Sequence, residues 1–142
     1  FTHPRAVDQL QDYVKEGFLS ALLSLMLLKS KPKVQERSTE LVEKMLRNCD
    51  LSNRNHSLAL HEEHFHDDMI KAGYLETLKQ LLEDLSTPIT MKYKILTLIS
   101  SETADLLMKH NCILSITSLL QSDDIQLKLM TLQLLTKQCK SN

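Results

Sequence analysis

The chain has 142 residues, enough for one domain with a core that needs neither metal ions nor disulfides. Two glycines and three prolines are too few for an all-β fold or a glycine-rich phosphate loop, whereas long helices need hardly any. The net charge of −1 and a pI near 6.6 argue against a dedicated nucleic-acid binder, so we expect no nucleic-acid partner.

The first predicted unit contains a glycine corner, a helix, a polar break and a longer helix. Gly17 is followed by apolar residues at helical spacing from Phe18 to Leu25. A glycine at such a point is typical of a left-handed residue that ends one helix and lets the next leave at an angle. The break at 30–32 ends in Pro32, which suits the first turn of a helix, and we predict that helix over 34–48.

The second predicted unit repeats this order after an insertion around 50–66. Gly73 takes the place of Gly17 and precedes another helix with apolar residues at helical spacing. The break that follows offers Thr87 as a helix cap and Pro88 as a first-turn residue. We predict the longer helix of this unit over 89–101.

The third predicted unit carries Asn111 where the other two carry glycine. Asparagine tolerates the left-handed conformation best after glycine, so the substitution preserves the corner. Ser122 or Asp123 is expected to cap the last helix, which we predict over 125–139.

The three units align with one another. Val34, Met91 and Leu127 lie at nearly the same distance beyond the glycine or asparagine of their unit, which is difficult to explain by chance. Since one helix triplet cannot cover its own apolar face, neighbouring units must stack. Three units are about the minimum for independent stability.

This layout resembles armadillo repeats, which have a short first helix, a corner containing glycine, and two longer antiparallel helices. The turn Ser122-Asp123-Asp124-Ile125-Gln126-Leu127 looks like the family's loop before its third helix. The resemblance covers nearly the whole chain and implies an all-α, right-handed α-solenoid of about three armadillo-like repeats in a single domain, 1–142. The expected divisions are a first repeat at about 4–50, an insertion with a first helix at about 51–72, a second repeat at about 57–101, and a third at about 102–142.

The family lines a groove with its third helices and often holds an extended peptide there with an Asn late in the helix. The matching positions here are Lys44, Ser101 and Lys137, so that way of clamping a peptide does not carry over. The resemblance still predicts which exposed third-helix positions would bind a partner. They are Glu40, Glu43, Lys44 and Arg47 in the first repeat, Thr97, Ser100 and Ser101 in the second, and Gln133, Thr136, Lys137 and Lys140 in the third.

The function that the resemblance implies is a protein–protein interaction module or scaffold, part of a larger adaptor, that binds a peptide or amphipathic helix of a partner protein. We expect no catalytic residue, no cofactor and no membrane-spanning segment. The three scattered cysteines indicate a reducing compartment and so an intracellular protein, cytoplasmic or nuclear. A chain that opens on Phe1 rather than Met favours a piece excised from a longer protein.

A second interpretation is a metal-dependent enzyme centred on His61 and His64. On a helix these two side chains share a face with Asp68, and borderline metals accept imidazole and carboxylate ligands. The zinc-protease pattern H-E-x-x-H needs its two histidines four residues apart, whereas these are three apart. We therefore expect a polar helix face without bound metal, with Phe65 and Met69 toward the core.

The last predicted helix and one cysteine raise further alternatives. Cys112 stands at the head of a helix, where a thiolate is stabilised, but a small buried core residue is the favoured interpretation. The stripe formed by Leu127, Met130, Leu134 and Leu135 is predicted to face the core. Apolar residues also occupy the other sides of that helix, so a further repeat, a homodimer mate or a ligand helix should cover it; these residues are Ile125, Leu129 and Leu132.

Overall fold

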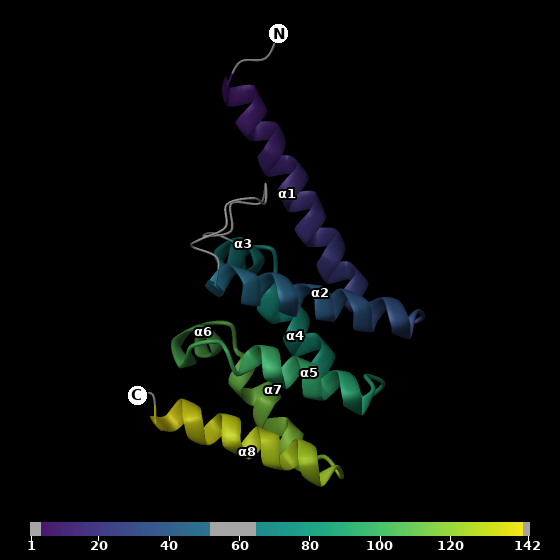
Figure 1. Ribbon diagram of the computed structural model, residues 1–142. Coiled ribbons are helices and arrows are strands. Elements are labelled where there is room, and N and C mark those ends of the chain that lie inside the picture. Colours follow the sequence, from purple (N-terminus) through teal and green to yellow (C-terminus); the bar gives the residue numbers. More distant parts are fainter. Residues whose placement is uncertain (1–3, 52–64, 141–142) are drawn as a thin grey trace. The chain divides into compact units, whose positions relative to one another are not determined.

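The structure is a computed structural model that describes residues 4–51 and 65–140, with side-chain surroundings at 15–47 and 65–139 (Figure 1). Every regular element in these ranges is helical, which confirms the all-α prediction for the described part of the chain. The helices are α1 (Pro4–Met26), α2 (Pro32–Leu51), α3 (Phe65–Lys71), α4 (Tyr74–Glu83), α5 (Ile89–Ile99), α6 (Ala104–Lys109), α7 (Cys112–Ser118), the short 3₁₀ helix η2 (Leu119–Gln121) and α8 (Ile125–Lys140).

The chain divides into two compact units, Phe1–Tyr74 and Leu75–Asn142. In the first unit, α2 packs against both α1 and α3. An ion pair of 2.8 Å between Lys15 Nζ and Asp68 Oδ2 connects α1 to α3, and both side chains are largely buried. The buried apolar residues of this unit are Leu19, Leu22, Leu23 and Met26 on α1, Val42 on α2, Phe65 and Met69 on α3, and Tyr74.

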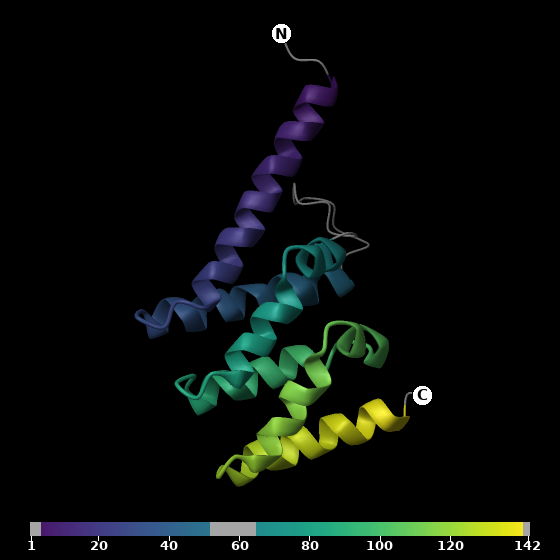
Figure 2. The same ribbon diagram turned by 180° about the vertical axis from the view of Figure 1, so that it is seen from behind.

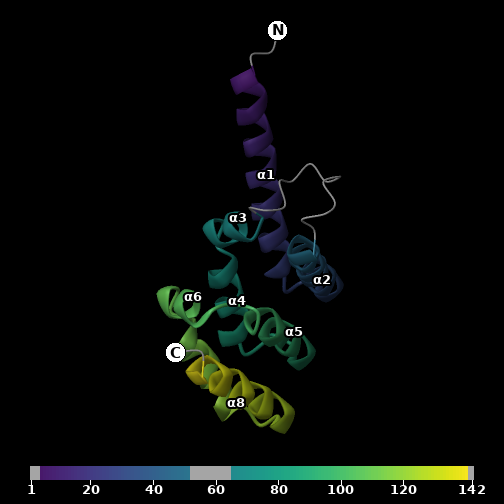
Figure 3. The ribbon, with the colours of Figure 1, turned by 60° about the vertical axis from the view of Figure 1, so that its left-hand side comes forward.

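In the second unit α8 packs along α5 and against η2, and α6 packs against α7. The helices α5 and α8 lie side by side in all three views (Figures 1, 2 and 3). Two polar contacts tie α4 to the residues that follow α6: His110 Nδ1 lies 2.6 Å from Glu76 Oε2, and the Ser115 hydroxyl donates to Glu83. Burial by itself would raise the pKa of Glu76, but the hydrogen bond with His110 brings that pKa below its ordinary value.

The corners at Gly73 and Asn111 are as predicted. Gly73 has φ 102° and Asn111 has φ 59°, both in the left-handed region that few other residues enter at low cost. Each of them ends a short helix (α3 and α6) and precedes the next one (α4 and α7). The two chain segments α3–α4–α5 and α6–α7–α8 thus have the same order: short helix, left-handed corner, helix, break, longer helix.

The predicted corner at Gly17 is wrong. The helix α1 runs without interruption from Pro4 to Met26, and the backbone at Gly17 does not have positive φ. The apolar positions 10, 14, 18 and 22 recur in steps of four across the glycine, so the helical pattern of the sequence continues through it. A glycine inside a helix costs only about 1 kcal/mol relative to alanine, which continuous packing of α1 offsets.

The caps differ from those predicted for two of the three longer helices. Pro32 begins α2 as expected, but Pro88 rather than Thr87 is the N-cap of α5, and no side chain caps that end. Asp124, not Ser122 or Asp123, caps α8. Its Oδ1 accepts hydrogen bonds from the backbone N–H of Leu127 at 2.8 Å and from the hydroxyl of Tyr93 at 2.7 Å. A cap that also binds α5 fixes the start of α8 against the preceding longer helix.

The longer helices α2, α5 and α8 share one register. They begin at Pro32, Ile89 and Ile125, so the aligned residues Val34, Met91 and Leu127 each stand third in their helix. Seven residues further on, this register places Leu41, Leu98 and Leu134 at equivalent positions. From their equal register we expect all three leucines in the core. Leu98 and Leu134 are buried, but Leu41 is 41% exposed, so the expectation is wrong for Leu41.

Truncating the two buried leucines should therefore destabilise the protein, whereas truncating the exposed one should not. We expect Leu98→Ala and Leu134→Ala each to lower the free energy of unfolding by roughly 2–5 kcal/mol, because each leaves a cavity. Leu41→Ala is the matched control and should cost only about 0.5–1 kcal/mol. Urea unfolding followed by circular dichroism measures all three. A loss for Leu41→Ala as large as for the other two would show that this side chain packs in the core.

Replacing Asp124 with alanine should lower the melting temperature, because α8 loses its N-cap and Tyr93 loses its acceptor. The hydrogen bond from Tyr93, with that from Leu127 N–H, holds the pKa of Asp124 below its ordinary value, and the same contact raises the pKa of Tyr93. A depressed carboxyl pKa stabilises the fold above the unfolded-state pKa, and this contribution is lost as the pH falls through the folded-state value. Melting curves of wild type and Asp124→Ala should thus differ at neutral pH and converge in acid. Asp123→Ala, one residue earlier, is the control, and an equal effect of both changes would contradict the capping role.

Candidate functional site

The second unit has an apolar surface formed by α6, α7 and α8, which we call the C-terminal surface. It comprises the apolar pocket residues Met108, Ile113, Leu114, Leu135 and Cys139, together with Leu129 and Leu132, which α8 also exposes. Leu114 is 80% exposed, and Leu129 and Leu132 are each 49% exposed. Apolar side chains grouped in this way, rather than scattered singly, are typical of surfaces that contact another molecule.

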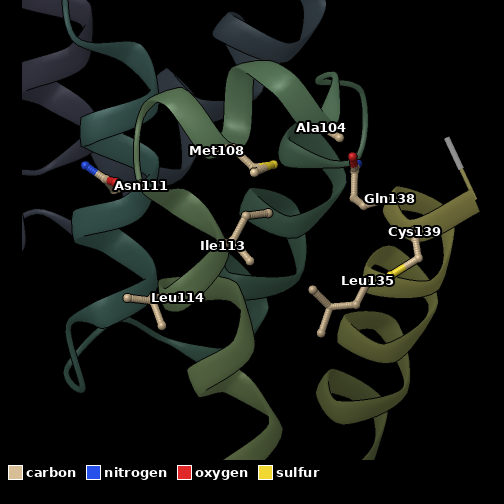
Figure 4. A pocket seen from close by; sticks show the side chains of 8 residues that line it. All are labelled: Ala104, Met108, Asn111, Ile113, Leu114, Leu135, Gln138 and Cys139. Atoms are coloured by element: carbon tan, nitrogen blue, oxygen red, sulfur yellow. The ribbon is translucent and has the colours of Figure 1, made fainter. Parts of the chain in front are cut away.

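A pocket of about 370 Å³ lies within this surface, between α6, α7 and α8. Figure 4 shows Met108 and Ile113 facing Leu135 and Cys139 across it, with Gln138 at its rim. The Gln138 side chain donates from Nε2 to the carbonyl oxygen of Glu102 at 3.4 Å. The pocket is large enough for one or two apolar side chains of a partner.

The exposed side of α8 carries its own apolar row. Ile125, Leu129 and Leu132 follow one another at steps of four and three residues, so they share one helix face. That face lies nearly opposite to the one on which Leu127 and Leu134 are buried. The prediction that the last helix carries apolar residues outside its core stripe is confirmed.

The predicted groove residues of the first unit lie on α2. Lys44 and Arg47 are exposed, and Arg47 forms an ion pair of 3.4 Å with Glu43 one turn earlier. Glu40 is exposed as well. The structure therefore places these residues on one helix, with two of the charges paired to each other, and the prediction that they bind a partner remains a prediction.

The predicted groove residues of the second and third repeats lie in the second compact unit, and several of their hydroxyl groups form hydrogen bonds within their own helices. The hydroxyl of Thr97 donates to the Tyr93 carbonyl, that of Ser100 to Thr97, and that of Thr136 to Leu132. The structure brings two predicted residues of different helices together, since Lys137 Nζ donates to the backbone oxygen of Ser100 at 2.7 Å. Ser101 and Gln133 are exposed, and the side chain of Lys140 lies outside the described residues.

The sequence analysis did not include Met108, Leu114 or Cys139 among the site residues. A signal was present, because Leu114 stands three residues after Asn111 as Glu76 stands three after Gly73. A leucine at a position where the preceding predicted repeat has an exposed glutamate indicates a surface that another molecule or segment covers. The pocket itself joins residues of three helices and had no signature in the sequence.

Cys112 is a core residue, as favoured from the sequence. Its side chain is only 1% exposed, and Sγ lies 4.0 Å from the backbone oxygen of Leu75. Burial raises the pKa of this thiol to about 11, and the carboxylates of Glu76, Glu102 and Glu83 act in the same direction. Since the thiolate is the nucleophile, these surroundings oppose covalent chemistry at Cys112.

The histidines proposed for a metal site, His61 and His64, lie outside the described residues, and the expectation of no bound metal remains a prediction. Their proposed helix-face neighbour Asp68 is in the described part and pairs with Lys15. That ion pair lines a pocket of about 380 Å³ in the first unit. Within the described ranges, no three side chains of His, Cys, Asp or Glu come together in a way that suits a metal ion.

Comparison of the chain with models of protein families, with curated proteins and with solved structures found no match. Among the described helices none combines the length and the apolar character needed to span a bilayer.

The two described free cysteines should differ strongly in reactivity. In the folded protein, iodoacetamide should modify the exposed Cys139 readily and the buried Cys112 far more slowly. Because the pKa of Cys112 is raised to about 11, mildly alkaline buffer should not remove the difference. Because this pKa is raised above its ordinary value of 9.0, the stability of the fold is unaffected below that value and falls as the pH rises from there through about 11. Peptide mass spectrometry gives the two rates, denaturant should make them equal, and equal rates in native buffer would contradict the burial of Cys112.

Proposed function

We propose that this chain is a protein-binding module made of about three armadillo-like repeats in a right-handed α-solenoid, without a catalytic role. The observation that carries the proposal is the C-terminal surface, where α6, α7 and α8 line an apolar pocket and α8 leaves Leu129 and Leu132 each half exposed. Support for the repeat architecture comes from the equal helix order of α3–α4–α5 and α6–α7–α8 and from the shared register of α2, α5 and α8.

The chemistry of the C-terminal surface favours a protein partner over a small polar substrate. Its lining offers thioether, aliphatic and thiol groups, with Gln138 and Asn111 as the polar side chains at the pocket. Apolar anchors of a partner gain free energy by leaving water for such a pocket, at about 25 cal/mol per Å² of apolar area removed from water. An amphipathic helix, with apolar residues at steps of three and four, matches a row with the same spacing on α8.

The third-helix groove is a second place where the partner would bind. Its hydroxyl groups at Thr97, Ser100 and Thr136 already donate to backbone carbonyls of their own helices. Such a surface offers few unused donors, and contacts between exposed charges contribute little to affinity. We therefore place the main binding energy on the C-terminal surface and regard the groove as the alternative.

The interpretation as a metal-dependent enzyme has no support from a described residue, because its histidines lie outside the described ranges. Elemental analysis of untagged protein tests it directly. Stoichiometric zinc, nickel or iron that is lost in the double variant His61→Ala and His64→Ala would overturn the proposal.

Leu132→Glu should weaken binding to a partner without unfolding the protein. A charge at the centre of an apolar contact typically costs about 2 kcal/mol or more, which corresponds to roughly a 30-fold rise in Kd. Candidates are captured with the wild-type chain, identified by mass spectrometry, purified, and measured against each variant by calorimetry. Leu85→Glu is the matched control, because Leu85 is 94% exposed in the loop between α4 and α5.

The same titrations decide between the two surfaces. Reversing Lys44 (to Glu) should leave Kd unchanged if the C-terminal surface holds the partner. Reversing Lys137 should, in addition, lower the melting temperature somewhat, since its ammonium group binds the end of α5. If these reversals abolish binding while Leu132→Glu does not, the partner lies in the groove and our assignment of the surface is wrong.

A further inference from the structure

The shared register allows each longer helix to be compared with the others position by position. In this register Leu96 and Ile99 of α5 correspond to Leu132 and Leu135 of α8. Leu96 and Ile99 are buried in a unit where α5 packs along α8, whereas Leu132 is half exposed and Leu135 is partly exposed. Among the described residues no helix follows α8. The apolar row that is covered on α5 is therefore also present on α8, without a cover.

The same comparison identifies a second row, on another side of the longer helices. Leu127 and Leu134 are the residues that α8 buries within its unit. Their equivalents on α2 are Val34 and Leu41, which are apolar but 37% and 41% exposed. The helix α2 thus has apolar residues at the positions that α8 buries within its unit, and on α2 these residues are exposed to solvent.

A charged position strengthens the likeness between α2 and α8. Lys137 of α8 donates to the carbonyl of Ser100 at the C-terminal end of α5. The equivalent residue is Lys44 in α2 but Ser101 in α5. Lysine near the last turn of a neighbouring helix is favoured, because unpaired carbonyls make that end partially negative. At three equivalent positions, then, α2 carries the same kind of residue with which α8 contacts or packs against its unit.

From these equivalences we propose that the chain associates head to tail with a second copy of itself. The α2 of one copy lies along the α8 of the other, as α8 lies along α5 within the second unit. Val34 and Leu41 then cover the row formed by Leu132 and Leu135, and Lys44 comes to the last turn of α8. This inference rests on the proposed function in one respect, namely that the C-terminal surface is a protein-binding surface.

The arrangement has a consequence for the size of the assembly. Two different surfaces meet in a head-to-tail contact. However many copies have bound, the open assembly therefore still has one free surface of each kind, at its two ends. Association should therefore continue beyond the dimer as the concentration rises. A contact between two copies of α8 would instead use one surface twice and stop at the dimer.

Sedimentation velocity of the full chain over a concentration series tests the proposal. The average mass of the wild type should rise with concentration past that of a dimer. Leu41→Glu and Leu132→Glu should each raise the dissociation constant at least tenfold and return the protein to a monomer, whereas Leu85→Glu should behave as wild type. An equimolar mixture of Leu41→Glu and Leu132→Glu should form a heterodimer that does not grow, because each variant keeps the surface that the other has lost.

Three results would overturn the head-to-tail contact: a wild type that is monomeric at every concentration, Leu41→Glu that still dimerises, or a mixture of the two variants that stays monomeric. Circular dichroism melting of each variant checks that it is folded, and Leu132→Ser replaces Leu132→Glu if the glutamate unfolds α8. Partner binding is measured on the same variants. If only the head-to-tail contact is wrong, the wild type stays monomeric but Leu132→Glu still weakens binding of the partner. If the proposed function is wrong, Leu132→Glu binds the partner as tightly as the wild type does.

Discussion

An apolar row on each side of a longer helix is the constraint on which the rest of this structure depends. A helix with one apolar face needs one neighbour, but α5, with Met91 and Leu98 on one side and Leu96 and Ile99 on another, needs neighbours on both. All four of these residues are buried. The left-handed corner at Asn111 turns the chain after α6, and the cap at Asp124 starts α8 where it packs along α5.

The features that were predictable from the sequence are those that a local pattern determines. The corners at Gly73 and Asn111 were predictable because the residue that follows each short helix must take positive φ, and only a few residue types do so readily. Gly17 shows the limit of this rule. Glycine permits a corner but does not impose one, and where the apolar spacing continues across it, as from position 14 to 18, packing of one long helix prevails.

What the sequence did not reveal depends on neighbours in space. Leu41 and Leu98 have the same position in their helices, yet only Leu98 is buried, since burial depends on what packs against the helix. Asp124, rather than Ser122 or Asp123, caps α8, and it also accepts the hydroxyl of Tyr93, a residue 31 positions earlier that no local pattern connects with it. The pocket near Leu135 and Cys139 required three helices to be placed first.

The two candidate binding surfaces differ in how much unused bonding capacity they retain. At the positions predicted to line a groove, Thr97, Ser100 and Thr136 donate to carbonyls of their own helices, and Glu43 pairs with Arg47. A partner that binds there must replace existing contacts or water by contacts of similar strength, and the net gain is small. At the C-terminal surface, by contrast, Leu114 and Leu132 expose apolar area to water, and contact with another apolar surface would remove that area from water with a gain in free energy. We therefore propose that a partner would gain most of its binding free energy on α6–α8, and that the predicted groove positions would serve selection among partners.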